Sequence, residues 1–191
     1  MEPESDRERW DRKYAAGEGP AHFRANRLLT EHRHLLTGGR ALDAACGFGG
    51  NALYLAQAGY RVDAVDVSSV GLARAQAEAA RRYLQISFVQ ADLSRWWMPD
   101  ERYDLILVFL YLNRDLVPRL AACLRPGGLL FQANRNRRFL ALRPDFDPGY
   151  LVEGNELTVL AHDAGLEVLY HDDGTGDQPR TSHLIARRPM P

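Results

Sequence analysis

Short apolar runs alternate with amphipathic segments along most of this chain, and the two patterns differ in period. Apolar runs bounded by turn residues predict buried strands, and apolar positions three or four apart predict helices. The expected strands are residues 40–44, 61–65, 86–90, 104–109, 129–133, 166–170 and 182–186. The expected helices are residues 6–16, 24–36, 50–58 and 155–164, one running from Ser68 or Ser69 to residue 83, and one from Asn113 or Asp115 to residue 124.

The order of these elements indicates the fold class. Alternating strands and helices predict a parallel sheet with helices on both faces. The last two strands are joined only by a polar loop, so they are expected to pair antiparallel. The prediction is an α/β fold with a seven-stranded, mostly parallel, Rossmann-like sheet and one antiparallel edge strand. We expect a single domain over residues 1–191, with an N-terminal helical cap at 1–37 and the core at 38–191.

Composition narrows the possible functions. The formal net charge of −1 gives no overall attraction to nucleic acid or to an anionic membrane, so neither is an expected partner. Cys46 and Cys123 form no CxxC pair, and the histidines are scattered, so neither a disulfide nor a metal site is indicated. The charged N-terminus lacks a signal-peptide core, and residues 105–112 are too few to cross a bilayer. We expect a cytoplasmic protein; its oligomeric state is not indicated.

Residues 41–51 carry the strongest chemical signal, reading Ala-Leu-Asp-Ala-Ala-Cys-Gly-Phe-Gly-Gly-Asn. A strand containing Asp43 leads into a loop with Gly47 and Gly49, and a helical pattern follows. Glycines let the backbone approach a ligand closely, and the free N–H groups of a helix start favour an anionic group. The span from Gly47 to Ala52 also satisfies the GxGxxA dinucleotide pattern. A nucleotide-like ligand is therefore expected, although a glycine-rich turn without a ligand remains possible.

Two further carboxylates follow neighbouring predicted strands. Asp66 comes directly after residues 61–65, where a carboxylate can accept two ribose hydroxyls or can cap the helix beginning near Ser68. Asp92 follows residues 86–90, where it can accept the amine of an adenine or act as an ordinary turn residue. Both acids are expected at the same end of the sheet as the glycine loop.

Together these motifs resemble the class I S-adenosylmethionine-dependent methyltransferases. The loop from Asp43 to Gly49 resembles the family's acid-x-Gly-x-Gly-x-Gly loop, with Ala45 in place of the first glycine. Tyr103-Asp104-Leu105-Ile106 resembles the family's fourth-strand motif, and Arg125-Pro126-Gly127-Gly128 its following turn. The resemblance covers residues 10–187 and implies S-adenosylmethionine as cofactor. The cofactor-binding residues it implies are Trp10, Tyr14, Asp43, Ala45, Gly47, Gly49, Asp66, Val67, Asp92, Leu93 and Phe109.

Within that class the chain resembles the small bacterial methyltransferases of the tellurite-resistance and thiopurine type. The resemblance lies in Trp10-Asp11-Arg12-Lys13-Tyr14 and in Gly154-Asn155-Glu156-Leu157. In such enzymes N-terminal helices form a lid, so Trp10 and Tyr14 either cover the cofactor or pack in the core. The implied acceptor is a small molecule, with a thiol, a chalcogen oxyanion and other soft nucleophiles among the candidates.

The acceptor side offers fewer signals, and no catalytic residue is assigned. An oxygen or nitrogen acceptor usually needs a positioned base, and none stands out. Tyr111 follows the fourth strand, where it could line the methyl group or pack in the core. Arg135, Arg137 and Arg143 follow the fifth strand, where they could clamp an oxyanion or form a solvated loop. We interpret the chain as a methyltransferase; the alternatives are a nicotinamide-dependent oxidoreductase and a non-catalytic S-adenosylmethionine-binding module.

Overall fold

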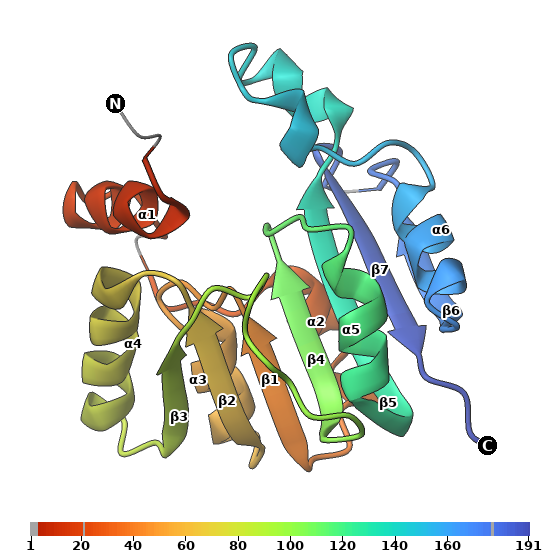
Figure 1. The fold of residues 1–191 in the computed structure, drawn as a ribbon, viewed down its shortest axis with the longest axis horizontal. Helices are drawn as coiled ribbons and strands as arrows, with labels where there is room; N and C mark the ends of the chain where they lie inside the picture. Colours follow the sequence, from red (N-terminus) through yellow and green to blue (C-terminus); the bar gives the residue numbers. More distant parts are fainter. Residues whose placement is uncertain (1–3, 21, 177) are drawn as a thin grey trace. The chain divides into compact units, whose positions relative to one another are not determined.

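A computed structural model describes residues 4–20, 22–176 and 178–191 of the chain. It contains two compact units, one ending at Trp97 and the other beginning at Met98 (Figure 1). The division into a cap at 1–37 and a core at 38–191 stays a prediction.

The first unit contains a parallel sheet with the strand order β3-β2-β1. Its strands are β1 (Arg40–Ala44), β2 (Arg61–Asp66) and β3 (Ile86–Gln90). Helices α3 (Gly50–Gln57) and α4 (Ser69–Arg81) connect the strands and pack against them. Asp66 pairs with Gln90 in the register, so the carboxyl ends of β2 and β3 lie level. The side chains that follow these strands therefore gather at one edge of the sheet.

Three short elements precede this sheet: α1 (Asp6–Ala15), α2 (Arg27–Glu31) and the 3₁₀ turn η1 (Arg33–Leu35). The single helix predicted over residues 24–36 is wrong. Asn26 caps the backbone N–H of Leu28, which sets the later start, and the backbone leaves the helical conformation at His32. The His32 ring contacts the carbonyl of Leu28 at 3.0 Å, a local side-chain contact at the point where the helix ends.

The second unit contains four strands in the order β4-β5-β7-β6. They are β4 (Tyr103–Phe109), β5 (Leu124–Arg135), β6 (Glu167–Asp172) and β7 (Thr181–Arg187). Strands β4 and β5 are parallel, and β7 runs antiparallel to both β5 and β6. The antiparallel pairing predicted for the last two strands is confirmed, with β7 inserted beside β5 and β6 outermost. Helices α5 (Leu116–Cys123) and α6 (Glu156–Asp163) pack on these strands.

The segment after β5 differs most from expectation. Two 3₁₀ turns that the sequence did not predict lie there, η2 (Arg137–Ala141) and η3 (Pro148–Tyr150).

The Pro-Gly-Gly turn falls inside β5, where Gly127 and Gly128 exchange backbone hydrogen bonds with Arg188. That pairing extends β5 beyond the predicted residues 129–133.

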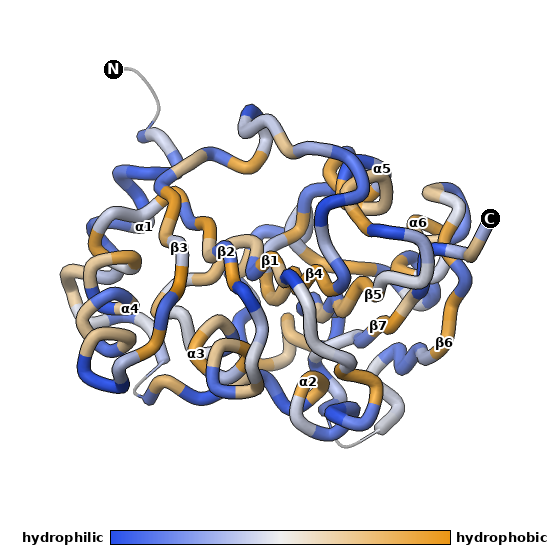
Figure 2. The backbone as a smooth tube through the Cα atoms, turned by 90° about the horizontal axis from the view of Figure 1, so that it is seen from below, coloured by the Kyte–Doolittle hydropathy of each residue, from blue (hydrophilic) through white to orange (hydrophobic). Residues whose placement is uncertain are grey.

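With three parallel strands in one unit and four mixed strands in the other, the predicted mostly parallel, seven-stranded Rossmann-like fold is confirmed. In Figure 2 hydrophobic stretches run along strands such as β3 and β5. Leu42 and Ala64 are fully buried in the first unit, as are Leu107 and Phe131 in the second. Among the described residues, no helix combines the length and hydrophobicity needed to cross a membrane.

Candidate functional site

Asp66 places a carboxylate at the carboxyl end of β2, and that side chain is only 5% exposed. Its Oδ2 accepts a hydrogen bond from the backbone N–H of Gly47 at 2.7 Å, and Oδ1 accepts one from Ser68 at 2.8 Å. Burial raises the pKa of Asp66, and these N–H donors oppose that rise. A carboxylate has about four acceptor positions. Asp66 therefore joins the glycine loop to the start of α4 and keeps capacity for ligand hydroxyls.

The loop between β1 and α3 turns through left-handed backbone conformations. The φ angles are +53° at Gly47 and +74° at Gly49, which glycine adopts without strain. A Cβ added to Gly49 would lie 2.9 Å from the Cβ of Ala75, so a larger residue there would collide. Ala45 also has a positive φ of +57°. The resemblance expects glycine at position 45, and the backbone supplies the physical reason.

Asp43 is the second buried acid of this site, at 1% exposure. Its Oδ2 accepts the backbone N–H of Ala52 at 3.0 Å, which ties β1 to the first turn of α3. Burial raises the pKa of Asp43 to about 7, and the charge of Asp66 adds to that effect. Burial together with these two acids also raises the pKa of Cys46.

The electrostatic character of the site follows from these two acids. Neither Asp43 nor Asp66 forms an ion pair with a basic side chain in the part of the chain that the structure describes. Buried carboxylates without a cation are costly, and a nearby positive charge stabilises their charged form. The glycine loop therefore favours a ligand that carries positive charge.

Helix α1 is fastened to the start of α4 by Asp11. Its Oδ1 accepts hydrogen bonds from the Ser68 hydroxyl at 2.6 Å and the Val70 backbone at 3.1 Å. Its Oδ2 accepts the Ser69 hydroxyl at 3.2 Å. The sequence analysis assigned no role to Asp11, because its partners lie far along the chain and no local pattern links them.

The contact made by Asp11 places Tyr14 over the glycine loop. The Tyr14 ring lies 4.7 Å from that of Phe48, measured between centroids, and 5.4 Å from that of Trp10. A Cβ on Gly47 would lie 3.1 Å from the Tyr14 hydroxyl, and one on Gly71 would lie 2.9 Å from the ring. Tyr14 therefore contacts the loop directly, whereas Trp10 packs against Tyr14 with its ring tilted by 42°.

Asp92 and its neighbours form a tight turn after β3. Oδ1 of Asp92 accepts both the backbone N–H of Ser94 at 2.9 Å and its hydroxyl at 2.7 Å. The hydroxyl hydrogen bond lowers the pKa of this exposed carboxyl. Leu93 is buried, at 4% exposure, and Val67 is half-buried at the end of β2. Asp92 therefore acts as a turn residue, which is one of the two roles that the sequence allowed. Neither of these two hydrogen bonds uses its Oδ2.

In the second unit, strained backbone marks the end of β4. Phe109 pairs with Ala133 of β5 and is half-buried, and Tyr111 is half-buried two residues later. Leu110, between them, has a φ of +60° and is 53% exposed. Such strain in a residue other than glycine is commonest at functional sites. The sequence carried no signal for it.

The three candidate arginines after β5 have different environments. Arg137 forms an ion pair with Glu153, and Arg143 forms one with Asp145. Arg135 instead donates from Nη1 to the Thr181 hydroxyl at 3.2 Å. Its guanidinium carbon lies 4.7 Å from the centroid of the Phe139 ring. The structure thus distinguishes Arg135 from the other two candidates.

A family model described as a methyltransferase domain matches residues 41–128, which include most of β1, the glycine loop, Asp66 and Asp92. This segment is therefore similar to methyltransferase domains. The match supports the resemblance to S-adenosylmethionine-dependent methyltransferases. It gives no information on the narrower tellurite-resistance and thiopurine type. The segment begins two residues before Asp43 and ends at the Pro-Gly-Gly turn.

The chain is also similar to curated proteins over about half its length. It is 38% identical over 96 residues to Hemagglutinin 1 of Eikenella corrodens, covering 47% of this chain and 32% of that protein. It is 36% identical over 96 residues to the malonyl-[acyl-carrier protein] O-methyltransferase of Enterobacter lignolyticus, covering 48% and 37%. The chain thus spans about a third of the length of these relatives.

A solved structure extends the similarity of fold to nearly the whole chain. It is phosphoethanolamine N-methyltransferase 2 of Haemonchus contortus, in complex with phosphomonomethylethanolamine and S-adenosylhomocysteine. The TM-score is 0.76 at 16% identity, with 98% of this chain and 61% of that chain covered. The comparisons give no support to the nicotinamide-dependent or non-catalytic alternatives.

Proposed function

We propose that this protein is a methyltransferase that uses S-adenosylmethionine and transfers the methyl group to a small molecule. The carrying observation is the pair of buried carboxylates at the glycine loop, Asp43 and Asp66, without a basic partner among the described residues. S-adenosylmethionine carries a sulfonium and an ammonium group, whereas a nicotinamide dinucleotide brings a negatively charged pyrophosphate. Asp66 alone does not discriminate, since a dinucleotide site also has an acid after its second strand. The additional carboxylate of Asp43 beside the glycine loop is what favours the first ligand over the second.

In this proposal, different residues of the first unit bind different parts of the cofactor. Asp66 accepts the ribose hydroxyls, while Gly47, Gly49 and Ala45 bring the loop backbone close to the amino-acid end. Asp43 holds the start of α3 through Ala52 and adds negative charge near the ammonium group.

The adenine end of the cofactor is bound by the turn after β3. Asp92 accepts the exocyclic amine through Oδ2, since the Ser94 contacts use Oδ1. Val67 and Leu93 flank the ring. Tyr14 and Trp10 cover the loop from α1, and Phe109 stays a candidate cofactor contact on the strength of the resemblance alone.

Bound S-adenosylmethionine supplies a methyl group already activated by its sulfonium. The chain's own residues then have to hold donor and acceptor in line and exclude water, and such positioning can contribute about 7–11 kcal/mol. A thiolate or chalcogenide acceptor needs little further help from a base. We therefore place the acceptor among soft nucleophiles, as in the tellurite-resistance and thiopurine type, with Tyr111, Arg135, Arg137 and Arg143 as candidate contacts.

Calorimetric titration with S-adenosylhomocysteine, with NAD as the competing ligand, tests the cofactor. Binding of the first and none of the second is expected. Asp66→Asn should weaken that binding, whereas the control Asp163→Asn, at an exposed carboxyl of α6, should not. A screen for S-adenosylhomocysteine release from S-adenosylmethionine with thiols and amines then tests the acceptor class. Binding of NAD instead would overturn the proposal.

A further inference from the structure

We propose that Arg135 forms an oxyanion site at the end of β5, and that the methyl acceptor carries a carboxylate or another oxyanion that binds there. The inference deepens the proposed function and rests on it, because it names the chemical group by which the acceptor is held. It distinguishes Arg135 from Arg137 and Arg143, which the sequence analysis treated alike.

Arg135 is a half-buried guanidinium without an acidic partner. It is the last residue of β5, and no carboxylate forms an ion pair with it in the described ranges. Burial lowers its pKa, and the positive charge of Arg180 lowers it further. A partly desolvated cation beside a like charge is destabilising, and an anion would relieve both effects.

Three other arginines of this unit already pair with carboxylates. Arg114 pairs with Glu156, Arg137 with Glu153 and Arg143 with Asp145. These three surface arginines thus find carboxylates of the chain itself, whereas Arg138 donates to the carbonyl of Asp173. Arg135 has no such carboxylate in the described ranges, and because it is also half-buried, an external anion would complete its environment.

The guanidinium is held in a fixed position with donors to spare. One N–H is used by the Thr181 hydroxyl, and the face of the group lies on the Phe139 ring. Phe139 is itself braced edge-on by Phe146, with 5.0 Å between ring centroids. A guanidinium has five N–H donors in a planar fork, so several remain for a bidentate oxyanion. Because stacking fixes the plane, little side-chain entropy remains to be lost on binding.

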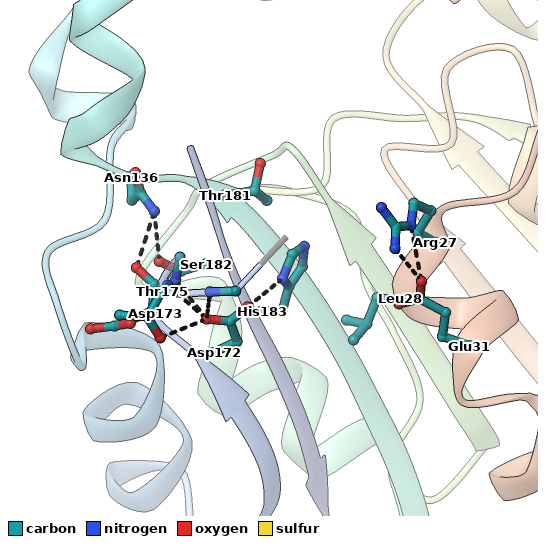
Figure 3. A network of polar contacts seen from close by, with 12 residues as sticks. Arg27, Leu28, Glu31, Asn136, Asp172, Asp173, Thr175, Thr181, Ser182 and His183 are labelled. Carbon is teal, nitrogen blue, oxygen red and sulfur yellow. Dashed lines mark hydrogen bonds and ion pairs between the residues drawn. The ribbon is translucent and has the colours of Figure 1, made fainter. Parts of the chain in front are cut away.

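The base of the site is ordered by polar contacts around the start of β7. Asn136 donates to the carbonyl of Asp173 at 3.2 Å and to the hydroxyl of Ser182 at 3.4 Å. Figure 3 shows both contacts. Asp172 accepts the backbone N–H of Thr175 at 3.0 Å, which closes the loop before β7. These contacts fix the start of the strand that carries Thr181.

Strand register places this guanidinium on the same side of the sheet as the end of β4. Phe109 pairs with Ala133, and side chains two residues apart on a strand share a face. Arg135 therefore lies on the face of Phe109, one step further toward the carboxyl edge. In open α/β sheets ligands bind outside that edge. An acceptor anchored at Arg135 would extend toward the end of β4, with the small side chain of Ala133 between them.

Binding of benzoate, benzamide and inorganic phosphate, measured by ligand-observed NMR with the protein saturated by S-adenosylhomocysteine, tests the inference. Benzoate and benzamide have similar shapes, but only the first carries the charge. We expect an oxyanion probe to bind about tenfold more tightly than benzamide. The ratio of benzoate to phosphate affinity distinguishes a carboxylate acceptor from a phosphorylated one.

Arg135→Gln should remove this preference, while Arg187→Gln should keep it, because Arg187 already pairs with Glu167. Thr181→Val, which keeps the guanidinium and removes its hydroxyl partner, should weaken oxyanion binding by a smaller factor even if Arg135→Gln fails to fold. Equal binding of benzoate, phosphate and benzamide by the wild-type protein would overturn the inference. So would equal losses in Arg135→Gln and Arg187→Gln. Titration of S-adenosylhomocysteine alone reports separately on the proposed cofactor.

Discussion

The carboxylate of Asp66 accepts the backbone N–H of Gly47 at 2.7 Å, so the acid that ends β2 also holds the glycine loop that follows β1. The two features that the sequence presents as separate motifs are therefore one structural unit. Any ligand that binds Asp66 is bound by a side chain already oriented from two directions, since Ser68 donates to its other oxygen.

Replacement of Asp66 by Asn tests its part in cofactor binding. The amide keeps the size of the side chain but loses the charge and one of the two acceptor oxygens. Hydrogen bonds to charged groups contribute about 1.5–3 kcal/mol, so affinity for S-adenosylhomocysteine should fall by about 10- to 150-fold in a calorimetric titration. Unchanged affinity, with Asp163→Asn as the matched control, would remove Asp66 from the site.

The buried state of Asp43 predicts a dependence of stability on pH. Its pKa rises to about 7 in the folded protein, above the ordinary value of 3.8, so the folded chain binds a proton more strongly than the unfolded chain. This contribution to stability is complete below the unfolded pKa and is lost as the pH rises through 7. Between pH 5.5 and 7 the contribution of Asp43 to the free energy of unfolding should fall by about 2 kcal/mol.

Urea unfolding of the wild-type protein and Asp43→Asn at both pH values isolates that contribution. Asparagine can still accept the backbone N–H of Ala52 but does not titrate, so the variant should show a smaller decrease. Parallel pH profiles for the two proteins would contradict the pKa assigned to Asp43.

Local patterns predicted the regular elements well, and contacts distant in sequence were not predicted. Strands β1 and β3 agree residue for residue with expectation, because apolar runs between turn residues are local signals. The contact between Asp11 and Ser68 spans 57 residues, and the pairing of Arg137 with Glu153 spans 16. Neither contact follows from a periodic pattern. The attachment of α1 to α4 and the ion pairs of the arginines could therefore be identified only in the structure.

The loop conformation at position 45 gives a second stability prediction. Ala45 has a φ of +57°, and the left-handed region costs a residue with a Cβ about 1–2 kcal/mol. Replacement by glycine removes this cost, but part of the gain is offset by the greater conformational freedom of glycine in the unfolded chain. Ala45→Gly should therefore raise the free energy of unfolding by about 0.5–1 kcal/mol.

The matched control is Ala58→Gly at the end of α3, where φ is −81° and no strain exists to relieve. The same chemical change there should destabilise the protein. Denaturant unfolding of both variants gives the comparison. Destabilisation by both substitutions would show that the backbone at Ala45 is not strained in the folded protein.

Loss of the Asp11 carboxylate should release α1 without unfolding the sheet. Asp11→Ala removes hydrogen bonds to Ser68, Ser69 and Val70, and a typical net contribution is about 1 kcal/mol for each. Helix α1 has no fully buried residue to hold it in their place. Amide hydrogen exchange over residues 6–15 should therefore accelerate, while exchange in β1 and β2 stays unchanged. Because Tyr14 would then leave the glycine loop, S-adenosylhomocysteine should also dissociate faster.

Asp6→Ala, at an exposed residue paired with Arg9, serves as the control and should alter neither rate strongly. Faster exchange throughout the first unit would mean that Asp11 supports the whole fold, and slow exchange in α1 would mean that other contacts hold the helix.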